Sequence, residues 1–313
     1  CSSDLRYLPT QMPRITFMGR VNYREPWCHF HRVTPVYILY YIFSGEMYLN
    51  ENGVEYVLRP GEYLLLEPGY ETFGTKAARC DYYFVHFEHM DFTPSSLSPE
   101  AIRRRLQQIR QMSLEEKLEP ESDYAQAECF LEKYAMVEDP AVRLRVYGLL
   151  EEAVQHTRLH TENHRCIGSC KLLESLMELS RSQADKILQQ HAACTPEMAE
   201  KIQQVVQYLH SEYPNKITSQ EIEIRFAVNF DYLNRVFRQV TGSTIFHYLS
   251  AVRLNHAKDF LATTTMRSSE IAGNTGIGAE YYFSKFFKKM TGLSPRQYRS
   301  RYLPEPNLSL HEK

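Results

Sequence analysis

The sequence lacks long hydrophobic runs and a large excess of either charge. No apolar stretch approaches the roughly 20 residues that a membrane-spanning helix needs, and the longest candidate, Tyr37 to Phe43, suits a buried strand. The first residues do not have the basic, apolar and small-residue pattern of a signal peptide, so we expect none. The seven cysteines are scattered without the spacing of a disulfide framework. This predicts reduced thiols in a cytoplasmic protein.

The overall net charge of −2 conceals an uneven distribution. Residues 200–303 hold 14 Lys and Arg against 8 Asp and Glu, a net charge of +6, whereas the remainder holds 22 against 30, a net charge of −8. A basic carboxyl-terminal third favours a polyanionic partner. The 43% hydrophobic content is ordinary for a globular protein, and 313 residues suffice for two or three domains.

One eleven-residue pattern occurs twice near the carboxyl end, at 232–242 and again 50 residues later at 282–292. Four of the eleven pairs are identical, which indicates an internal repeat. Apolar residues recur at helical spacing in both copies, and a Gly follows the last of them, where a helix commonly ends in the left-handed region. The residues expected to be buried are Leu233, Val236, Phe237, Val240, Phe283, Phe286, Phe287 and Met290.

A shorter helix is predicted before each copy, at 219–227 and at 268–275, with Gly276 at the second turn. Each pair therefore has the order of a helix-turn-helix motif. A single copy would be equally compatible with an ordinary amphipathic helix and a solvated charged face. Two copies at one offset, each preceded by a short helix and followed by Thr-Gly, favour the motif.

Residues from about 199 to 302 resemble the DNA-binding domain of the AraC/XylS family of bacterial transcription regulators. The resemblance depends on the two repeats, on apolar and small residues of the shorter helices, and most specifically on the closing run from Thr291 to Arg299. The matching residues of the shorter helices and turn are Ile222, Ile271, Ala272 and Gly276. Two positions depart from the family pattern: Glu223 replaces a usual Ala, and Ala227 replaces a usual turn Gly.

The polar faces of the two repeats supply the candidate DNA contacts. Arg and Lys suit guanine acceptors, Asn suits adenine, and carboxylates accept from cytosine. The predicted base-contacting residues are Asp231, Asn234, Arg235, Glu280, Tyr281, Ser284 and Lys285. The predicted phosphate-contacting residues are Arg238, Lys288 and Lys289. In the family, a long helix, predicted here at 244–262, fixes two recognition helices in major-groove segments about 34 Å apart.

The amino-terminal third has short β-prone runs separated by turns, with Asn52-Gly53 as a strong hairpin signal. Strands are predicted at 37–43, 47–49, 54–58, 63–67 and 81–87, which suggests a barrel or a sandwich. The Gly45, Pro60-Gly61 and Pro68-Gly69 turns resemble the cupin-like effector domain of AraC-type regulators. In that family the domain usually binds a small molecule, often a sugar, inside the barrel.

Candidate effector-binding residues are aromatic and polar side chains near the start of this domain. They are Arg24, Trp27, His29, His31, Tyr40 and Glu46. An aromatic core without a ligand is the plain alternative. A metal-dependent cupin enzyme is disfavoured, because Pro35, Val36 and Thr72 stand where that class needs its further ligands. His164, Cys166 and Cys170 match no strong zinc spacing, so we predict neither a metal nor a cofactor.

Helices are predicted in the middle third, at 101–112, at 124–137 and from Asp139-Pro140 onward, where Val142, Val146, Leu149 and Ala153 would be buried. A further buried stripe is predicted at Leu173, Met177, Ser180, Ala184 and Ile187. In the family such a helix commonly pairs two subunits. Residues 163–169 were open to interpretation as a loop.

These patterns predict an α+β multidomain protein. A cupin-like β-barrel effector domain would span 1–95, a helical linker or dimerisation region 96–195, and an all-α domain with two helix-turn-helix motifs 196–303. The expected function is a sequence-specific DNA-binding transcription regulator, not an enzyme, controlled by a sugar or related polar metabolite. It would bind double-stranded DNA as a cytoplasmic homodimer, with RNA polymerase as a further partner. The alternatives are a metal-dependent cupin enzyme fused to a DNA-binding domain, and a regulator controlled by a protein partner.

Overall fold

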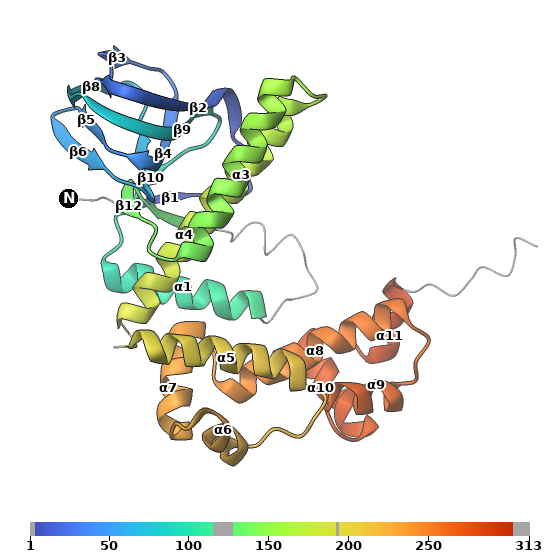
Figure 1. Ribbon diagram of the computed structural model, residues 1–313. Helices are drawn as coiled ribbons and strands as arrows, with labels where there is room; N and C mark the ends of the chain where they lie inside the picture. Colours follow the sequence, from blue (N-terminus) through green and yellow to red (C-terminus); the bar gives the residue numbers. More distant parts are fainter. Residues whose placement is uncertain (1–3, 115–127, 192–193, 303–313) are drawn as a thin grey trace, which may run out of the picture. The chain divides into compact units, whose positions relative to one another are not determined.

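The chain folds into two compact units (Figure 1). The computed structural model describes residues 4–114, 128–191 and 194–302. The first unit comprises residues up to 98 together with 127–186, and the second comprises 99–126 and the chain from 187 onward. The middle segment, predicted as one linker region at 96–195, is therefore divided between the two units.

The first unit is built from antiparallel strands in three sheets. A five-stranded sheet has the order β12-β7-β4-β9-β2, a four-stranded sheet has the order β3-β8-β5-β6, and β1 lies between β10 and β11. The strands are β1 Asp4–Tyr7, β2 Arg14–Trp27, β3 Arg32–Val33, β4 Tyr37–Gly45, β5 Met47–Glu51, β6 Val54–Leu58, β7 Glu62–Leu66, β8 Glu71–Lys76, β9 Ala78–Glu88, β10 Thr93–Pro94, β11 Cys129–Glu132 and β12 Tyr134–Met136.

The central strands are apolar on both faces because each face is covered. On β4, Tyr40 and Ile42 point into a core between the two larger sheets, whereas Leu39 and Tyr41 point to the opposite face. Alternation along a strand produces this division. Asn52 and Gly53 both have positive φ, 49° and 85°, and close the predicted β5–β6 hairpin. The predicted cupin-like, sheet-rich domain is confirmed.

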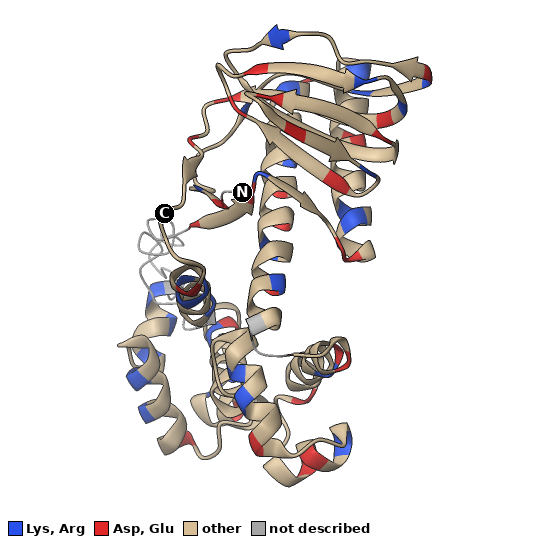
Figure 2. Cartoon of the chain, turned by 90° about the vertical axis from the view of Figure 1, so that its left-hand side faces the viewer, with Lys and Arg blue, Asp and Glu red and all other residues tan. Residues whose placement is uncertain are grey.

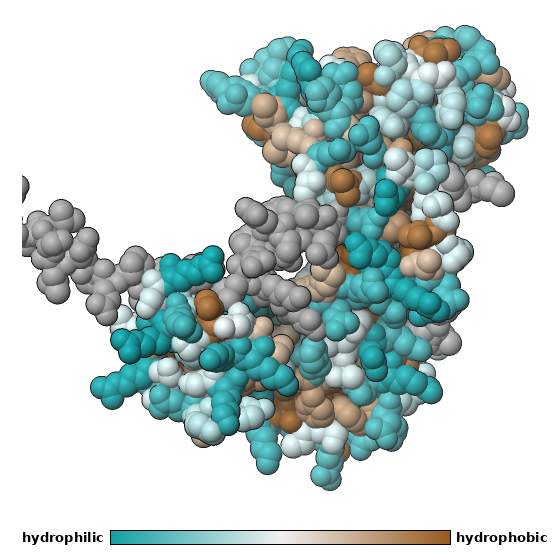
Figure 3. Space-filling model, turned by 180° about the vertical axis from the view of Figure 1, so that it is seen from behind, coloured by the Kyte–Doolittle hydropathy of each residue, from teal (hydrophilic) through white to brown (hydrophobic). Residues whose placement is uncertain are grey.

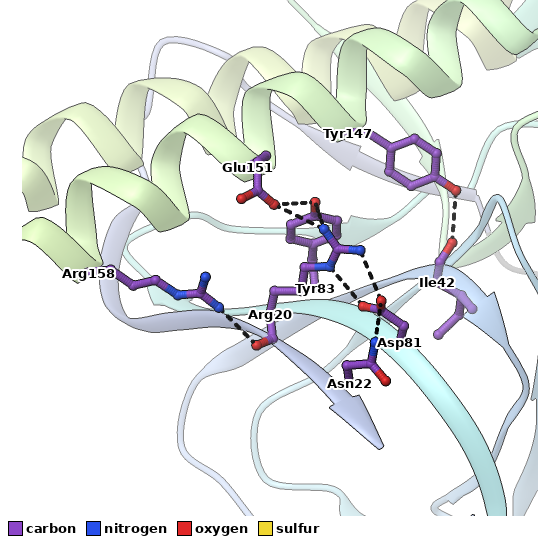
Figure 4. Close-up of polar contacts among 8 residues, drawn as sticks. All are labelled: Arg20, Asn22, Ile42, Asp81, Tyr83, Tyr147, Glu151 and Arg158. Carbon is purple, nitrogen blue, oxygen red and sulfur yellow. Dashed lines mark hydrogen bonds and ion pairs between the residues drawn. The ribbon is translucent and has the colours of Figure 1, made fainter. Parts of the chain in front are cut away.

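Two helices cover the outer face of the five-stranded sheet: α3, Pro140–Leu159, and α4, His164–His191. The four residues predicted to be buried on α3 are buried. Polar contacts add to the packing (Figure 4): Tyr83 donates to Glu151 of α3 over 2.6 Å, and Tyr147 donates to the carbonyl of Ile42 over 3.0 Å. Arg20 makes an ion pair with Asp81 at 2.8 Å beside this contact.

Two predictions for the middle third were wrong, and a third was right only in part. The helix predicted at 124–137 is replaced, over its described part, by β11 and β12, which pair with β1 and β7. Pairing with distant strands decided the local structure there. The stripe predicted on α4 is right in part: Ser180 and Ala184 are buried, whereas Met177 is exposed. The apolar core contacts of this helix are made mainly by Leu172, Leu176 and Leu179. The loop interpretation of 163–169 fails because α4 begins at His164.

The second unit is all-helical. Its helices are α1 Pro99–Leu114, α5 Pro196–Glu212, α6 Ser219–Phe226, α7 Phe230–Thr241, α8 Ile245–Thr263, α9 Ser268–Thr275, α10 Glu280–Thr291 and α11 Pro295–Tyr302. α5 to α7 share one core with the start of α8, and the rest of α8 shares a second core with α9 to α11. α8 therefore connects two helix-turn-helix modules, α6–α7 and α9–α10.

α1 belongs to the second unit although it follows the sheet strands in sequence. It packs against α7, where Gln107 Nε2 donates to the carbonyl of Gln239 over 2.8 Å and Arg110 donates to that of Val240 over 2.6 Å. Both carbonyls lie in the last turn of α7, where helices leave carbonyl groups without intrahelical partners. α1 therefore caps the carboxyl end of α7.

Candidate nucleic-acid interface and barrel interior

The α7 helix divides into an apolar and a polar face, as predicted. Leu233, Val236, Phe237 and Val240 are buried. Asp231, Arg235 and Arg238 are exposed. Gly242 ends the helix in the left-handed region, with φ of 81°.

The α10 helix repeats this division. Phe283 and Phe287 are fully buried, and Phe286 and Met290 are partly buried against the same core. The exposed predicted residues are Glu280, Tyr281, Lys285, Lys288 and Lys289, and Ser284 is half-buried. Gly292 ends this helix with φ of 78°. Two polar helix faces therefore occupy equivalent positions in the two modules.

The turn of the first module explains its departure from the family pattern. Glu223 Oε1 accepts from the backbone N–H of Phe230 over 2.7 Å and from Asn229 Nδ2 over 3.1 Å. Asn229 Oδ1 in turn accepts from the N–H of Tyr232 over 3.1 Å. Glu223 thus caps the amino end of α7, where a negative charge is favourable. Ala227 adopts the left-handed conformation, with φ of 50°, in which a glycine would be unstrained.

The second module closes its turn differently. Gly276 ends α9 with φ of 66°, as the sequence predicted. The α10 N-cap is Ala279, which provides no side-chain hydrogen bond to the helix. Ala272 stands where the first module has Glu223, and it is buried. The amino end of α10 therefore lacks the side-chain caps that α7 has.

Asn234 has a contact that the sequence did not predict. Its Oδ1 accepts from the backbone N–H of Ile245 over 2.9 Å. Ile245 is the first residue of α8, so Asn234 joins α7 to the amino end of the connecting helix. Its carbonyl oxygen is used within the protein, whereas its Nδ2 keeps donor capacity.

Aromatic rings accompany the exposed cations of both modules. The Arg235 guanidinium lies 5.4 Å from the centre of the Tyr232 ring, and Lys285 Nζ lies 4.5 Å from that of Tyr281. Tyr282, which the sequence analysis assigned no contact, is 60% exposed. Its exposure could have been predicted from the sequence, because Tyr282 falls outside the apolar residues that recur at helical spacing on α10.

Lys and Arg recur on the helices of the second unit (Figure 2). On the face shown in Figure 3, hydrophobic residues form separate patches on a mainly hydrophilic surface. Arg238, Lys288 and Lys289 lie in the last turns of α7 and α10. This arrangement suits contacts to a polyanion more than burial against an apolar partner.

The six candidate effector residues separate into two groups in the first unit. Trp27, His29 and Glu46 border one small cavity of about 10 Å³. Tyr40 is buried, and its hydroxyl lies 2.7 Å from His29 Nε2. His31 is exposed and contacts Glu71, and Arg24 is exposed on β2. His29 and His31 do not share a strand face, because residues 28–31 lie between β2 and β3.

The structure adds two residues to the buried pair. Arg32 Nη2 donates to the Tyr40 hydroxyl, and His86 lies on β9 beyond the inward-facing Tyr82. Burial, together with the nearby charge of Arg32, lowers the pKa of both His29 and His86 to about 4. Both imidazoles are therefore neutral near pH 7.

Metal chemistry finds no support in the described part of the chain. Among residues 4–114, 128–191 and 194–302, no group of three His, Cys, Asp or Glu side chains is arranged to hold a metal ion. Cys166 and Cys170 are exposed, unpaired thiols. None of the described helices is both long and apolar enough to cross a bilayer.

Comparison with known proteins matches both units. Residues 23–162 match the family model described as an AraC-like ligand binding domain, and residues 224–301 match one described as a helix-turn-helix domain. The chain is 30% identical over 321 aligned positions to an uncharacterized HTH-type transcriptional regulator, YisR, of Bacillus subtilis. This match covers 92% of the chain and 97% of the relative.

Two further matches cover shorter parts of the chain. The HTH-type transcriptional activator RhaR of Yersinia pseudotuberculosis is 43% identical over 76 residues, 24% of this chain and 26% of that protein. Among solved structures, the carboxyl-terminal domain of AraT, a response regulator from Geobacillus stearothermophilus, matches with 28% identity and a TM-score of 0.33. That match covers 38% of this chain and 94% of the solved chain.

Proposed function

The chain belongs to the AraC/XylS family of bacterial transcription regulators, and from this premise we propose how it meets DNA and its effector. It is a DNA-binding regulator with an AraC-like ligand-binding domain and a helix-turn-helix domain. In the proposal, α7 and α10 enter successive major-groove segments on one side of the duplex. The base-contacting residues are Asp231, Asn234 through Nδ2, Arg235, Glu280, Tyr281, Ser284 and Lys285.

The observation that carries this proposal is the matched exposure of the two helices. Each buries its apolar residues in a separate core, and each leaves its charged residues on the outside. Arg238, Lys288 and Lys289 lie in the last turns and are assigned to phosphates, which supply affinity without sequence information.

Base contact and phosphate contact can be separated by mutation. A duplex selected by the full chain from a random pool provides the specific site, and an unrelated duplex provides the reference. We expect Arg235→Ala to cost about 1–3 kcal/mol on the selected duplex and much less on the unrelated one. An equal loss on both would remove Arg235 from the base-contacting set.

Lys288→Ala should weaken both duplexes alike and reduce the slope of affinity against salt concentration. The matched control is Lys186→Ala, since Lys186 is a cation of the first unit that pairs with Glu138 at 2.7 Å. It should change neither affinity nor slope. A selective effect of Lys288→Ala on the chosen sequence would contradict the phosphate assignment.

The effector signal is proposed to reach the DNA-binding unit through α1. The strands on either side of α1 in the chain, β10 and β11, both pair with β1 in the first unit. α1 itself caps the last turn of α7 through Gln107 and Arg110. A change in the β1 sheet on effector binding would therefore alter the support of the first recognition helix. Such coupling requires that effector and DNA favour the same arrangement.

The remaining assignments follow the family. The effector is a small polar metabolite bound in the barrel, and the protein acts as a homodimer in the cytoplasm, where its DNA and RNA polymerase are found. Its role is regulatory rather than enzymatic, and no cofactor is assigned. Size-exclusion chromatography with light scattering on the full chain would test the dimer, and a monomeric mass at micromolar concentration would contradict it.

A further inference from the structure

A chain of hydrogen bonds inside the first unit joins His29 and Tyr40 to the Arg32 guanidinium. Neutral His29 can donate from Nδ1 to the carbonyl of Phe30, 2.9 Å away, and accept at Nε2 from the Tyr40 hydroxyl, 2.7 Å away. The Tyr40 oxygen then accepts from Arg32. Tyr40 and His29 are 2% and 6% exposed. This chain of bonds holds the Arg32 guanidinium in one position.

The charge of Arg32 has no counterion among the described residues. It makes no ion pair with a described carboxylate, and its buried Nε has no hydrogen-bond partner there. The groups that face it are neutral: Tyr40, His29 and His86, with the Phe30 ring 5.2 Å from its guanidinium carbon. A partly buried cation without a counterion is unfavourable unless an anion joins it.

Two other cations of the same unit show the usual arrangement. Arg20 pairs with Asp81 at 2.8 Å (Figure 4), and Lys133 bridges Glu51 at 2.7 Å and Glu67 at 2.5 Å. Their side chains are 27% and 11% exposed. Arg32 differs from them in lacking a carboxylate, although it lies in the domain that matches a ligand-binding family.

We propose that the effector is an organic acid whose carboxylate binds the Arg32 guanidinium between His29 and His86. This proposal rests on the proposed function, since it assumes an effector in the barrel. A guanidinium fork fits a carboxylate through two parallel hydrogen bonds, and the free Nε is one donor for them. A carboxylate carries one negative charge, which matches the single cation. A phosphate monoester carries about 1.5–2 negative charges at neutral pH, which the single charge of Arg32 would neutralise only in part.

The body of the ligand lies on the aromatic side of the cluster. His86 has the rings of Phe84 and Phe17 at 5.8 and 6.0 Å, and His29 has Trp27 at 5.3 Å. The cavity bordered by Trp27 and His29 measures about 10 Å³, which is about the room for one water molecule. A ligand of more than a few atoms therefore requires side chains around this cavity to move. In the proposal Trp27, whose ring is stacked on Tyr23 at 4.2 Å, is the side chain that moves.

This displacement makes binding measurable, because Trp27 is the single Trp of the chain. The experiment titrates the full chain at constant ionic strength with matched probes and follows Trp fluorescence and thermal unfolding. The probes are benzoate against benzamide, galacturonate against galactose, and inorganic phosphate. We expect at least one acid, and not its uncharged counterpart, to change the fluorescence and raise the unfolding temperature.

Variants assign the effect to the guanidinium. Arg32→Gln should weaken binding of that acid by about tenfold to a hundredfold, and Arg32→Lys should retain part of it. Arg14→Gln is the control, because Arg14 is a cation of β2 whose side chain is 69% exposed and which is not a candidate effector residue, and this variant should bind as the parent does. An unfolding temperature of the first unit that matches the parent's in the absence of ligand shows that each variant is folded.

Other outcomes would refute the carboxylate assignment without refuting the proposed DNA-binding function. If galactose or benzamide binds as well as its acid, or if the acid binds Arg32→Gln equally well, the effector site stands and the carboxylate assignment fails. A response to phosphate alone also refutes it. If none of the acids changes the fluorescence or the unfolding temperature while the chain still binds its selected duplex, the inference fails and DNA-binding regulation remains.

Discussion

Removal of the Glu223 carboxylate tests how the first recognition helix is held. Glu223 accepts from the N–H of Phe230 over 2.7 Å and from Asn229 over 3.1 Å, so Glu223→Ala leaves the first N–H of α7 without its protein partner. A hydrogen bond to a charged group and the favourable helix-dipole interaction together indicate a loss of about 1.5–2 kcal/mol. Glu223→Gln keeps an acceptor and should lose about 0.5–1 kcal/mol.

The assay is amide hydrogen exchange of residues 229–237 in the full chain, together with urea unfolding. We expect protection of this segment to fall in the order parent, Glu223→Gln, Glu223→Ala, while α10 is unchanged. Glu200→Ala is the control, since Glu200 is exposed and its side chain accepts from Gln204 of its own helix over 3.3 Å. This variant should alter stability by less than about 0.5 kcal/mol. Equal protection in parent and Glu223→Ala would refute the capping role. Greater protection in Glu223→Ala would mean that the Glu223 charge destabilises the amino end of α7.

Four further predictions concern single positions. Ala227→Gly should raise stability by about 0.5–1 kcal/mol in urea unfolding, because φ of 50° strains Ala; a loss would contradict this. Gly242→Ala should lower the free energy of unfolding by about 2–3 kcal/mol, since φ is 81° and the new Cβ would lie 2.7 Å from a backbone oxygen of α1. Limited proteolysis should then cleave α1 more readily, and an unchanged cleavage rate would argue against the contact between α1 and α7. Tyr83→Phe should cost about 1 kcal/mol, measured by thermal unfolding of the first unit, by removing the hydrogen bond to α3. Because burial lowers the pKa of His29 and His86 to about 4, protonation of either side chain favours the unfolded state. The free energy of unfolding should therefore be highest above pH 6.5 and decline toward pH 4, and the decline should be less steep in His29→Asn. An equally steep decline in parent and variant would contradict the assignment.

The features that the sequence predicted correctly are those encoded locally. The α9 helix begins and ends where predicted, at Ser268 and Thr275, because cap residues and helical periodicity lie within a few positions of each other. Gly242, Gly276 and Gly292 all adopt the left-handed conformation expected of them. The hairpin at 52–53 was equally predictable, since its turn residues determine its geometry.

The features that failed depend on distant partners. Residues 129–136 became strands because β1 and β7 present unpaired edges to them. The hydrogen bond from the amino end of α8 to Asn234, eleven positions earlier, was also missed, whereas the contact of Asn234 with DNA remains a prediction. α1 resembled any helix of a linker, and its packing against α7 could not be read from its own periodicity.

The chemistry of the barrel illustrates the same limit for function. Arg20, Arg32 and Lys133 are three cations among β-prone residues, and nothing in their immediate neighbours distinguishes them. Asp81 neutralises Arg20 from 61 positions away, and Lys133 is neutralised from 66 and 82 positions away. Only the fold shows that no described carboxylate reaches Arg32. The proposed ligand site is therefore identified by a cation without a carboxylate partner. Which cation lacks a partner depends on ion pairs between residues far apart in the sequence.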